Sequence, residues 1–264
     1  MKSKYINYVF TLICIIIIII IIIFIVRLNY KKHNYISENF NNPTYYIFWT
    51  GGYDSTFRIL QALLIENAIV YPIYLSGIID NMKDHSTRRK NNKQEFEALK
   101  KIYNVINNKY PNKSKNLKSL IIIPNVKLSK TVNDNMYILY KKGYVRRPIC
   151  QYGSLAQVAI DMNVPIELAV ENEPHSSIMY RAISDKVSGK GINRKINNKT
   201  LNTQSEFYIY KNFRFPTLSL TKKDMLKIAK KNGFDDILRL TWSCWYPINN
   251  RPCNRCVMCR ERII

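Results

Sequence analysis

From residue 44 onward, short apolar runs alternate along the chain with amphipathic stretches. Polar or turn residues lie close to the ends of each apolar run. The runs are residues 45–49, 69–75, 120–123, 166–170 and, as a fifth, 215–218. Runs of this length are typical of buried strands. Apolar residues recur at helical spacing in residues 55–66, 93–106, 155–162 and 221–231. Strands that alternate with helices predict an α/β domain with a mainly parallel sheet, and residues 181–203, rich in Gly, Asn and Lys, predict a loop.

The N-terminal part of the chain contains one stretch that is apolar on every side. Residues 9–26 carry no charged side chain and have isoleucine at every position from 15 to 23. A helix of this length, at about 1.5 Å per residue, spans roughly 27 Å and crosses a bilayer core. We expect a single membrane anchor within residues 1–32, followed by a polar linker at 33–43. A cleaved signal peptide is the alternative, but no small-residue cleavage site follows the stretch.

Two glycines follow the first predicted strand directly, in a segment that reads T-G-G-Y-D-S-T over residues 50–56. Glycines let backbone N–H groups close around an anion, and the N-terminus of the following helix favours phosphate. Asp54 would repel phosphate, so its presence favours a Mg²⁺ ligand or a role in orienting the loop. The candidate phosphate-binding residues are Thr50, Gly51, Gly52, Asp54, Ser55 and Thr56. A plain strand-to-helix turn is the alternative.

Four cysteines gather near the C-terminal end of the sequence, at Cys244, Cys253, Cys256 and Cys259. Four thiolates at this spacing are typical of a tetrahedral zinc site, and an iron–sulfur cluster is the chemical alternative. A closed four-cysteine zinc site is structural, so we expect no catalytic role for these residues. Because reduced thiolates belong to the cytosol, we expect the part of the chain after the membrane anchor to face the cytoplasm.

The chain is strongly basic, with 41 Lys and Arg against 18 Asp and Glu and a formal charge of +23. An apolar fraction of 47% excludes a disordered tail. The basic residues are scattered from Lys83 to Arg262, and Lys, Asn, Ile and Tyr are all over-used. This pattern favours a bias of composition over a dedicated nucleic-acid face, although binding to tRNA stays open.

The glycine loop and the C-terminal motif T-W-S-C-x8-C-x2-C-x2-C-x2-R, which runs from Thr241 to Arg262, form a specific pair. Over residues 44–264 the chain resembles the 7-cyano-7-deazaguanine synthase family of the PP-loop ATP pyrophosphatases. The resemblance implies a Rossmann-like sheet of the adenine nucleotide alpha hydrolase type, with an ATP-binding domain at 44–240 and a zinc-binding tail at 241–264. It implies ATP on the six loop residues, with Asp54 and Ser55 as catalytic residues. One structural Zn²⁺ and a Mg²⁺ ion are the expected metals.

The resemblance also implies a reaction within queuosine biosynthesis. An ATP-dependent C–N ligase would adenylate a carboxylate, 7-carboxy-7-deazaguanine or a related compound, and convert it with ammonia to an amide or nitrile. The chain departs from the family at the segments that line the base pocket, where the candidate residues are Cys150, Gln151, Glu171, Glu173 and His175. His175 follows a predicted strand and is a candidate base near neutral pH, with a solvated loop as the alternative.

Two other functions stay open at this stage. The first is a tRNA-modifying PP-loop enzyme of the thiolase type, which the positive charge favours and which tight tRNA binding or a catalytic need for Cys150 would support. The second is a non-catalytic, membrane-anchored zinc module, which would bind no nucleotide.

Overall fold

The computed structural model describes residues 42–76, 91–148, 150–175, 177–202 and 204–262. The predicted membrane anchor at residues 9–26 lies outside these ranges. Within them, no helix is both long enough and apolar enough to cross a membrane. The fold described below belongs to the compact unit Pro43–Ile264.

The centre of this unit is a parallel sheet, which in the described part of the chain has five strands in the order β3-β2-β1-β4-β7. The strands are β1 (Thr44–Phe48), β2 (Ile69–Leu75), β3 (Ile121–Ile123), β4 (Ile166–Glu167) and β7 (Phe213–Arg214). The central pair is in register from Thr44 opposite Ile69 to Phe48 opposite Ile73. Because every pair in this sheet is parallel, the predicted α/β class with a parallel sheet is confirmed.

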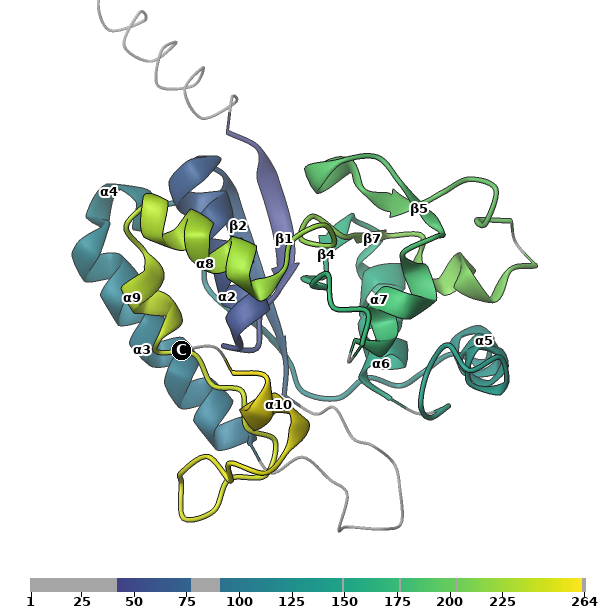
Figure 1. The fold of residues 1–264 in the computed structure, drawn as a ribbon. Helices are drawn as coiled ribbons and strands as arrows, with labels where there is room; N and C mark the ends of the chain where they lie inside the picture. The colour runs from purple at the N-terminus through teal and green to yellow at the C-terminus, as the bar shows by residue number, and fades with distance from the viewer. Residues whose placement is uncertain (1–41, 77–90, 149, 176, 203, 263–264) are drawn as a thin grey trace, which may run out of the picture. The chain divides into compact units, whose positions relative to one another are not determined.

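Helices cover both faces of the sheet (Figure 1). One face carries α2 (Tyr53–Leu60), its π-helical continuation η1 (Gln61–Ile65), α3 (Asn92–Lys109), α4 (Pro111–Ser114), α8 (Lys222–Lys231) and α9 (Asp235–Leu238). The other side carries α5 (Lys130–Lys141), α6 (Gln151–Met162), α7 (Ile178–Ile183) and η4 (Glu206–Tyr210). The remaining described elements are β5 (Val187–Ser188), η3 (Gly191–Asn193), β6 (Lys195–Ile196) and α10 (Val257–Arg260).

Strand β1 and the residue after it show why the sheet is buried on both sides. Ile47 and Trp49 pack into the apolar cluster beneath α2 and α3, whereas Phe48 packs into the cluster beneath α6 and η4. Successive side chains of a strand point to opposite faces, so a strand between two helical layers needs a continuous apolar run. The aromatic run of β1 meets this need, and it directs the following glycine loop to the carboxyl end of the sheet.

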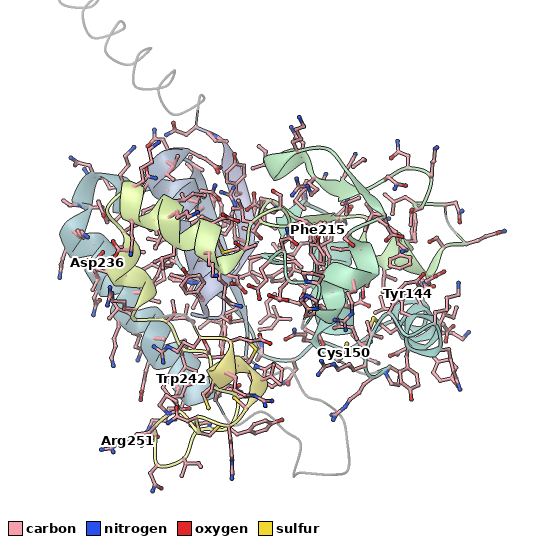
Figure 2. All side chains as sticks on the ribbon, viewed as in Figure 1. Tyr144, Cys150, Phe215, Asp236, Trp242 and Arg251 are labelled. Atoms are coloured by element: carbon pink, nitrogen blue, oxygen red, sulfur yellow. The ribbon has the colours of Figure 1, made fainter. Side chains whose placement is uncertain are left out.

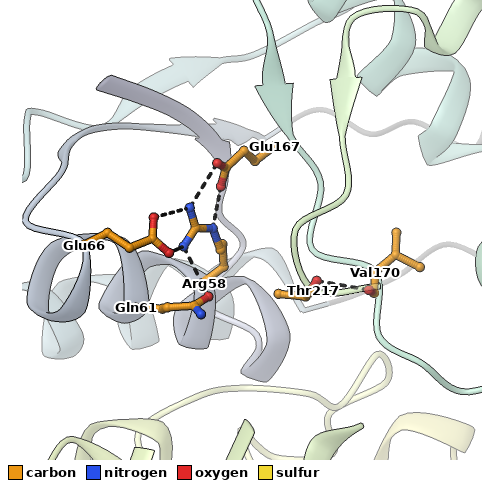
Figure 3. Close-up of polar contacts among 6 residues, drawn as sticks. All are labelled: Arg58, Gln61, Glu66, Glu167, Val170 and Thr217. Atoms are coloured by element: carbon orange, nitrogen blue, oxygen red, sulfur yellow. Dashed lines mark hydrogen bonds and ion pairs between the residues drawn. The ribbon is translucent and has the colours of Figure 1, made fainter. Parts of the chain in front are cut away.

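The fifth strand lies two residues before the predicted position. The strand is Phe213–Arg214, and the predicted residues 215–218 form a turn in which the Thr217 hydroxyl donates to the Val170 carbonyl oxygen over 3.0 Å (Figure 3). The predicted loop at 181–203 is also partly wrong, because it contains the antiparallel pair β5–β6. Both short elements depend on tertiary contacts, such as the bond from the Phe215 N–H to the Arg194 carbonyl oxygen at 2.9 Å.

A buried arginine fastens helix α2 to strand β4. The Arg58 side chain is fully buried, and its Nε lies 2.6 Å from Glu167 Oε2 while its Nη1 lies 2.6 Å from Glu66 Oε1 (Figure 3). Burial alone would lower the pKa of Arg58, but the hydrogen bonds and charges of Glu167 and Glu66 raise it above its usual value. Arg58 therefore stays charged, and it fixes the helix that begins at the glycine loop.

Candidate active site

A cavity of about 440 Å³ lies at the carboxyl ends of β1 and β4, the edge at which parallel α/β sheets bind ligands. Its walls come from the glycine loop, the segment after β4, the start of α6, the start of α8 and the tail after α9. The predicted site residues that line it are Thr50, Gly52, Asp54, Ser55, Cys150, Gln151 and Glu171. Those that do not line it are Gly51, Thr56, Glu173 and His175.

Gly51 supports the loop from beneath the cavity. Its φ is +72°, and a Cβ at this position would lie 3.0 Å from the carbonyl oxygen of Glu95 in α3. Its own carbonyl oxygen accepts a hydrogen bond from the backbone N–H of Trp242 at 3.0 Å. Only glycine takes this backbone conformation without strain and leaves room for α3. Gly51 therefore lets the loop contact α3 and the tail together.

The three hydroxyl residues of the loop have different positions. Thr56 is fully buried, and its hydroxyl accepts a hydrogen bond from the Trp49 indole at 2.9 Å. This bond holds the start of α2 against the end of β1 and places Thr56 outside the cavity. Thr50 accepts from the Gly52 N–H at 3.4 Å, and the Ser55 hydroxyl donates to the Gly52 carbonyl oxygen at 3.3 Å. These two hydroxyl residues line the cavity and are placed to meet a ligand.

Asp54 brings an unsatisfied acidic oxygen to the same wall. Its Oδ1 atom is buried and has no hydrogen-bond partner within the described structure. Burial, and then the negative charge of Glu171, raise the pKa of Asp54 to about 7, while Lys222 opposes the rise. A buried carboxylate oxygen without a partner fits the donor chemistry of a Mg²⁺ site, because Mg²⁺ takes oxygen ligands from one or two carboxylates together with substrate phosphates.

Lys222 is a cavity residue that the sequence reasoning did not select. Its Nζ lies 2.5 Å from Glu171 Oε1. Burial alone would lower the pKa of Lys222, but the charges of Asp54 and Glu171 raise it above its usual value. A capping box at Thr221 and Asp224 begins α8 immediately before Lys222. The T-K-K-D pattern was the available signal, because it predicts a helix start with a lysine in the first turn.

Other cavity residues were also missed, namely Arg146, Arg147, Trp242, Trp245 and Glu261. By contrast, His175 is exposed on the loop after β4 and outside the cavity. Its backbone N–H donates to Glu173 Oε1 at 3.1 Å, and Arg181 donates to its carbonyl oxygen at 2.8 Å. The structure thus gives Glu173 and His175 a local role in holding this loop.

The four tail cysteines form one cluster, which confirms the predicted grouping. Their Sγ atoms all lie within 4.8 Å of one another. The Cys253–Cys259 and Cys256–Cys259 sulfur distances are 3.9 and 3.5 Å. A tetrahedron with zinc–sulfur bonds of about 2.3 Å has sulfur–sulfur distances of about 3.8 Å, so the cluster fits a zinc ion.

Asparagines in left-handed conformation shape the cluster. Asn249 and Asn250, with φ of 48° and 61°, form the tip of a small hairpin in which Ile248 and Arg251 exchange two 2.9 Å bonds. Positive φ at both tip residues is typical of a type I′ turn, and the hairpin returns the chain toward Cys244. Asn254, with φ of 54°, follows Cys253 directly.

Backbone N–H groups point at the sulfurs of this cluster. The Cys253 N–H donates to Cys244 Sγ at 3.2 Å, and the Cys256 N–H donates to Cys253 Sγ at 3.4 Å. Backbone hydrogen bonding, first from Arg255, lowers the pKa of Cys253 to about 6. Such donors stabilise thiolates, which are the form that binds metal.

The tail meets the glycine loop at the cavity. Cys150 comes from the start of α6 and Trp242 from the segment after α9, so the cavity draws on distant parts of the sequence (Figure 2). The Trp242 indole N–H donates to the Cys244 carbonyl oxygen at 2.7 Å. Gln94 of α3 donates to the Asn250 side chain at 3.0 Å. The four-cysteine cluster is therefore connected to the cavity through Trp242.

Comparison with known families agrees with this arrangement. The family model described as queuosine biosynthesis protein QueC matches residues 193–263. The matched part includes β7, α8 and the four cysteines, and the glycine loop precedes it. No curated protein matches the chain. The C-terminal part of the chain is therefore QueC-like, at the family level.

Proposed function

We propose that this domain is an ATP-dependent C–N ligase of the PP-loop type. It would adenylate a carboxylate, 7-carboxy-7-deazaguanine or a related compound, and convert it with ammonia to an amide or nitrile. The observation that carries the proposal is the bond between the Trp242 N–H and the Gly51 carbonyl oxygen at 3.0 Å. This bond joins the tail, which the family model matches, to the glycine loop at one cavity. The glycine loop and the four-cysteine tail would therefore serve a single site.

The glycine loop suits the phosphates of ATP. Thr50, Gly52 and Ser55 bring hydroxyl and backbone groups to the cavity wall, at the start of α2. The positive end of a helix favours anions at this place. In the proposed first step, a carboxylate oxygen of the substrate attacks the α-phosphorus of ATP and pyrophosphate leaves. The loop positions the departing phosphates and stabilises the charge that develops on them.

Lys222 and Asp54 supply the charged groups of this step. Lys222 lines the cavity beside Glu171 and stays protonated, so it offers a positive charge to the phosphates. Asp54 would hold a Mg²⁺ ion, which would supply positive charge to offset the negative charge of the phosphates. Without such an ion, Asp54 would face phosphate as a second negative group.

The remaining walls suit a flat ring with polar edges. Phe48, Ile73 and Leu75 line the cavity at the ends of β1 and β2, and Tyr152 and Leu155 line it from α6. A volume of about 440 Å³ lies in the usual range for small-molecule sites. In the second half of the reaction, ammonia would take the place of AMP on the activated carboxyl carbon. The zinc site would have no part in these steps beyond holding the tail in place.

The test is turnover of ATP to AMP and pyrophosphate by the full chain, with ammonia and 7-carboxy-7-deazaguanine. We expect Asp54→Asn to lower this turnover by about 100-fold or more, because it removes a preorganised charge from the site. The matched control is Asp236→Asn, whose carboxylate makes an exposed ion pair with Lys109 at 2.8 Å. Equal turnover in the wild type and Asp54→Asn would rule out the proposed loop chemistry.

A further inference from the structure

A cysteine outside the four-cysteine cluster lines the cavity of the candidate active site. Cys150 is the N-cap residue of α6, a helix of 12 residues. Its backbone is extended, with φ of −151° and ψ of 172°, and its side chain makes no capping hydrogen bond to the helix. The side chain is partly buried and belongs to the cavity wall. ATP binding by the glycine loop makes no use of it.

The surroundings of Cys150 favour a reactive thiol. The N-terminus of α6 presents the positive end of a helix dipole, and Arg146 and Arg147 line the same cavity. Cysteines at helix N-termini and beside arginines are typical nucleophiles, because both features stabilise the thiolate. The backbone N–H groups in the first turn of α6 would also stabilise the negative charge that develops on a carbonyl oxygen during attack by the thiol.

A second observation, on a different segment, points to a ligand in this cavity. The Oδ1 atom of Asp54 is buried at the wall and lacks a hydrogen-bond partner among the described residues. A buried carboxylate oxygen of this kind is costly unless something else satisfies it. Asp54 comes from the loop after β1 and Cys150 from the start of α6. A ligand that fills the cavity would therefore contact both the glycine loop and the thiol.

We propose that Cys150 accepts the activated acyl group as a thioester, an inference that rests on the proposed function. The thiolate sulfur attacks the carbonyl carbon of the acyl-adenylate. A C–S bond forms, the bond from carbon to the phosphate oxygen breaks, and AMP leaves with the electron pair. Ammonia then attacks the thioester carbon. A C–N bond forms, the C–S bond breaks, one proton of the ammonia passes to water, and the amide leaves with the thiolate regenerated.

The thioester gives this site a way to retain the acyl group. The acyl group loses its phosphate contacts to the glycine loop when AMP leaves. A covalent bond to Cys150 holds it in the cavity and divides one difficult displacement into two easier ones. The thiol is thereby a catalytic residue of the second half of the reaction.

The test uses the full chain, loaded with zinc, together with ATP, Mg²⁺ and 7-carboxy-7-deazaguanine, and with ammonia left out. Acid-quenched protein is analysed by intact mass spectrometry and then by peptide mapping. We expect an added mass equal to the carboxylic acid minus one water, located on the peptide that carries Cys150 and removed by neutral hydroxylamine. The adduct is absent from Cys150→Ala, in which amide formation falls by about 100-fold or more. Zinc content and melting temperature of the variant show that it is folded.

Two controls separate this proposal from the proposed function. ATP–pyrophosphate exchange in the wild type reports adenylation alone. Absence of exchange would overturn the proposed function and the thioester with it. Exchange and amide formation by the wild type, with no adduct on Cys150 and with full amide formation by Cys150→Ser, would overturn the thioester only.

Discussion

The backbone N–H of Trp242 lies 3.0 Å from the carbonyl oxygen of Gly51 and donates a hydrogen bond to it. This bond connects the segment that leads into the four-cysteine cluster with the loop that opens helix α2. It uses backbone atoms at both ends, so it depends on the position of the two segments more than on their side chains. The conformation of the glycine loop therefore depends on whether the tail is folded.

The first prediction concerns the space around Gly51. Gly51 and Gly143 both have positive φ, +72° and +77°, but only at Gly51 would a Cβ meet other atoms within 4 Å. We expect Gly143→Ala to lower the free energy of unfolding by about 1–2 kcal/mol from backbone strain alone. Gly51→Ala should cost more, because the nearest atom is the Glu95 carbonyl oxygen at 3.0 Å and backbone cannot move aside cheaply.

Urea unfolding of the two glycine variants measures this difference. We also expect Gly51→Ala to weaken ATP binding, since the glycine loop must shift away from α3, whereas Gly143 follows α5 and is no part of that loop. Equal losses of stability in the two variants would show that crowding of the new Cβ against α3 adds nothing to the cost of backbone strain.

The second prediction concerns the metal. We expect one zinc ion per chain, held by the four tail cysteines. Removing it with a chelator should lower the melting temperature and the ATP-dependent turnover together, because Trp242 links the cluster to the glycine loop. Metal analysis, thermal unfolding and an activity assay before and after zinc is restored check this expectation. Full turnover by metal-free protein would contradict the coupling.

The third prediction concerns the buried arginine. Arg58→Met leaves Glu167 buried without its cation, and we expect a loss of about 3–5 kcal/mol in the free energy of unfolding. The control is Lys142→Met, which removes a more exposed ion pair with Glu206 at 3.0 Å and should cost less than about 1 kcal/mol. Denaturant titrations compare the two variants. Similar small losses in both would mean that the buried network contributes no more than a surface pair.

The fourth prediction concerns pH and the cap of α8. Hydrogen bonds from Thr221 lower the pKa of Asp224 in the folded chain. The capping box therefore stabilises the fold fully above the unfolded-state pKa of about 3.9 and loses this contribution as pH falls through the lower folded value. Asp224→Ala should be less stable than the wild type at pH 7, and the difference should shrink below about pH 4.

Urea titrations at several pH values measure this change. Asp134→Ala is the control, because its exposed carboxylate forms a surface ion pair with Lys130 in the i,i+4 geometry at 3.1 Å. A difference between Asp224→Ala and the wild type that stays constant from pH 7 to pH 3 would count against the capping box as its source.

The hydrophobic pattern was sufficient to predict most of the sheet. β2 lies at the predicted residues 69–75, where the run of large apolar residues begins after Ala68 and ends before Ser76. The pattern failed where elements are short and held by tertiary bonds, as at β7 and at the β5–β6 pair. Helix α5 was missed because the mixture of Asn, Tyr and Lys in it hides the three buried positions Val132, Met136 and Leu139.

The site was predictable where its residues are neighbours in sequence. The glycine loop and the cysteine cluster each lie within one short segment, so spacing alone indicated them. Lys222 and Trp242 reach the cavity only because α8 and the tail fold back to the end of β1. Thr56 illustrates the opposite error: the motif includes it, but the helix turn that begins at Tyr53 directs its hydroxyl to Trp49.

Adenylation of a carboxylate is the central claim, and oxygen transfer tests it most directly. The full chain is incubated with ATP, ammonia and 7-carboxy-7-deazaguanine labelled with ¹⁸O in its carboxylate, and the AMP is analysed by mass spectrometry. The account predicts that each AMP carries one ¹⁸O atom from the substrate. Formation of ADP, or of AMP without label, would contradict it.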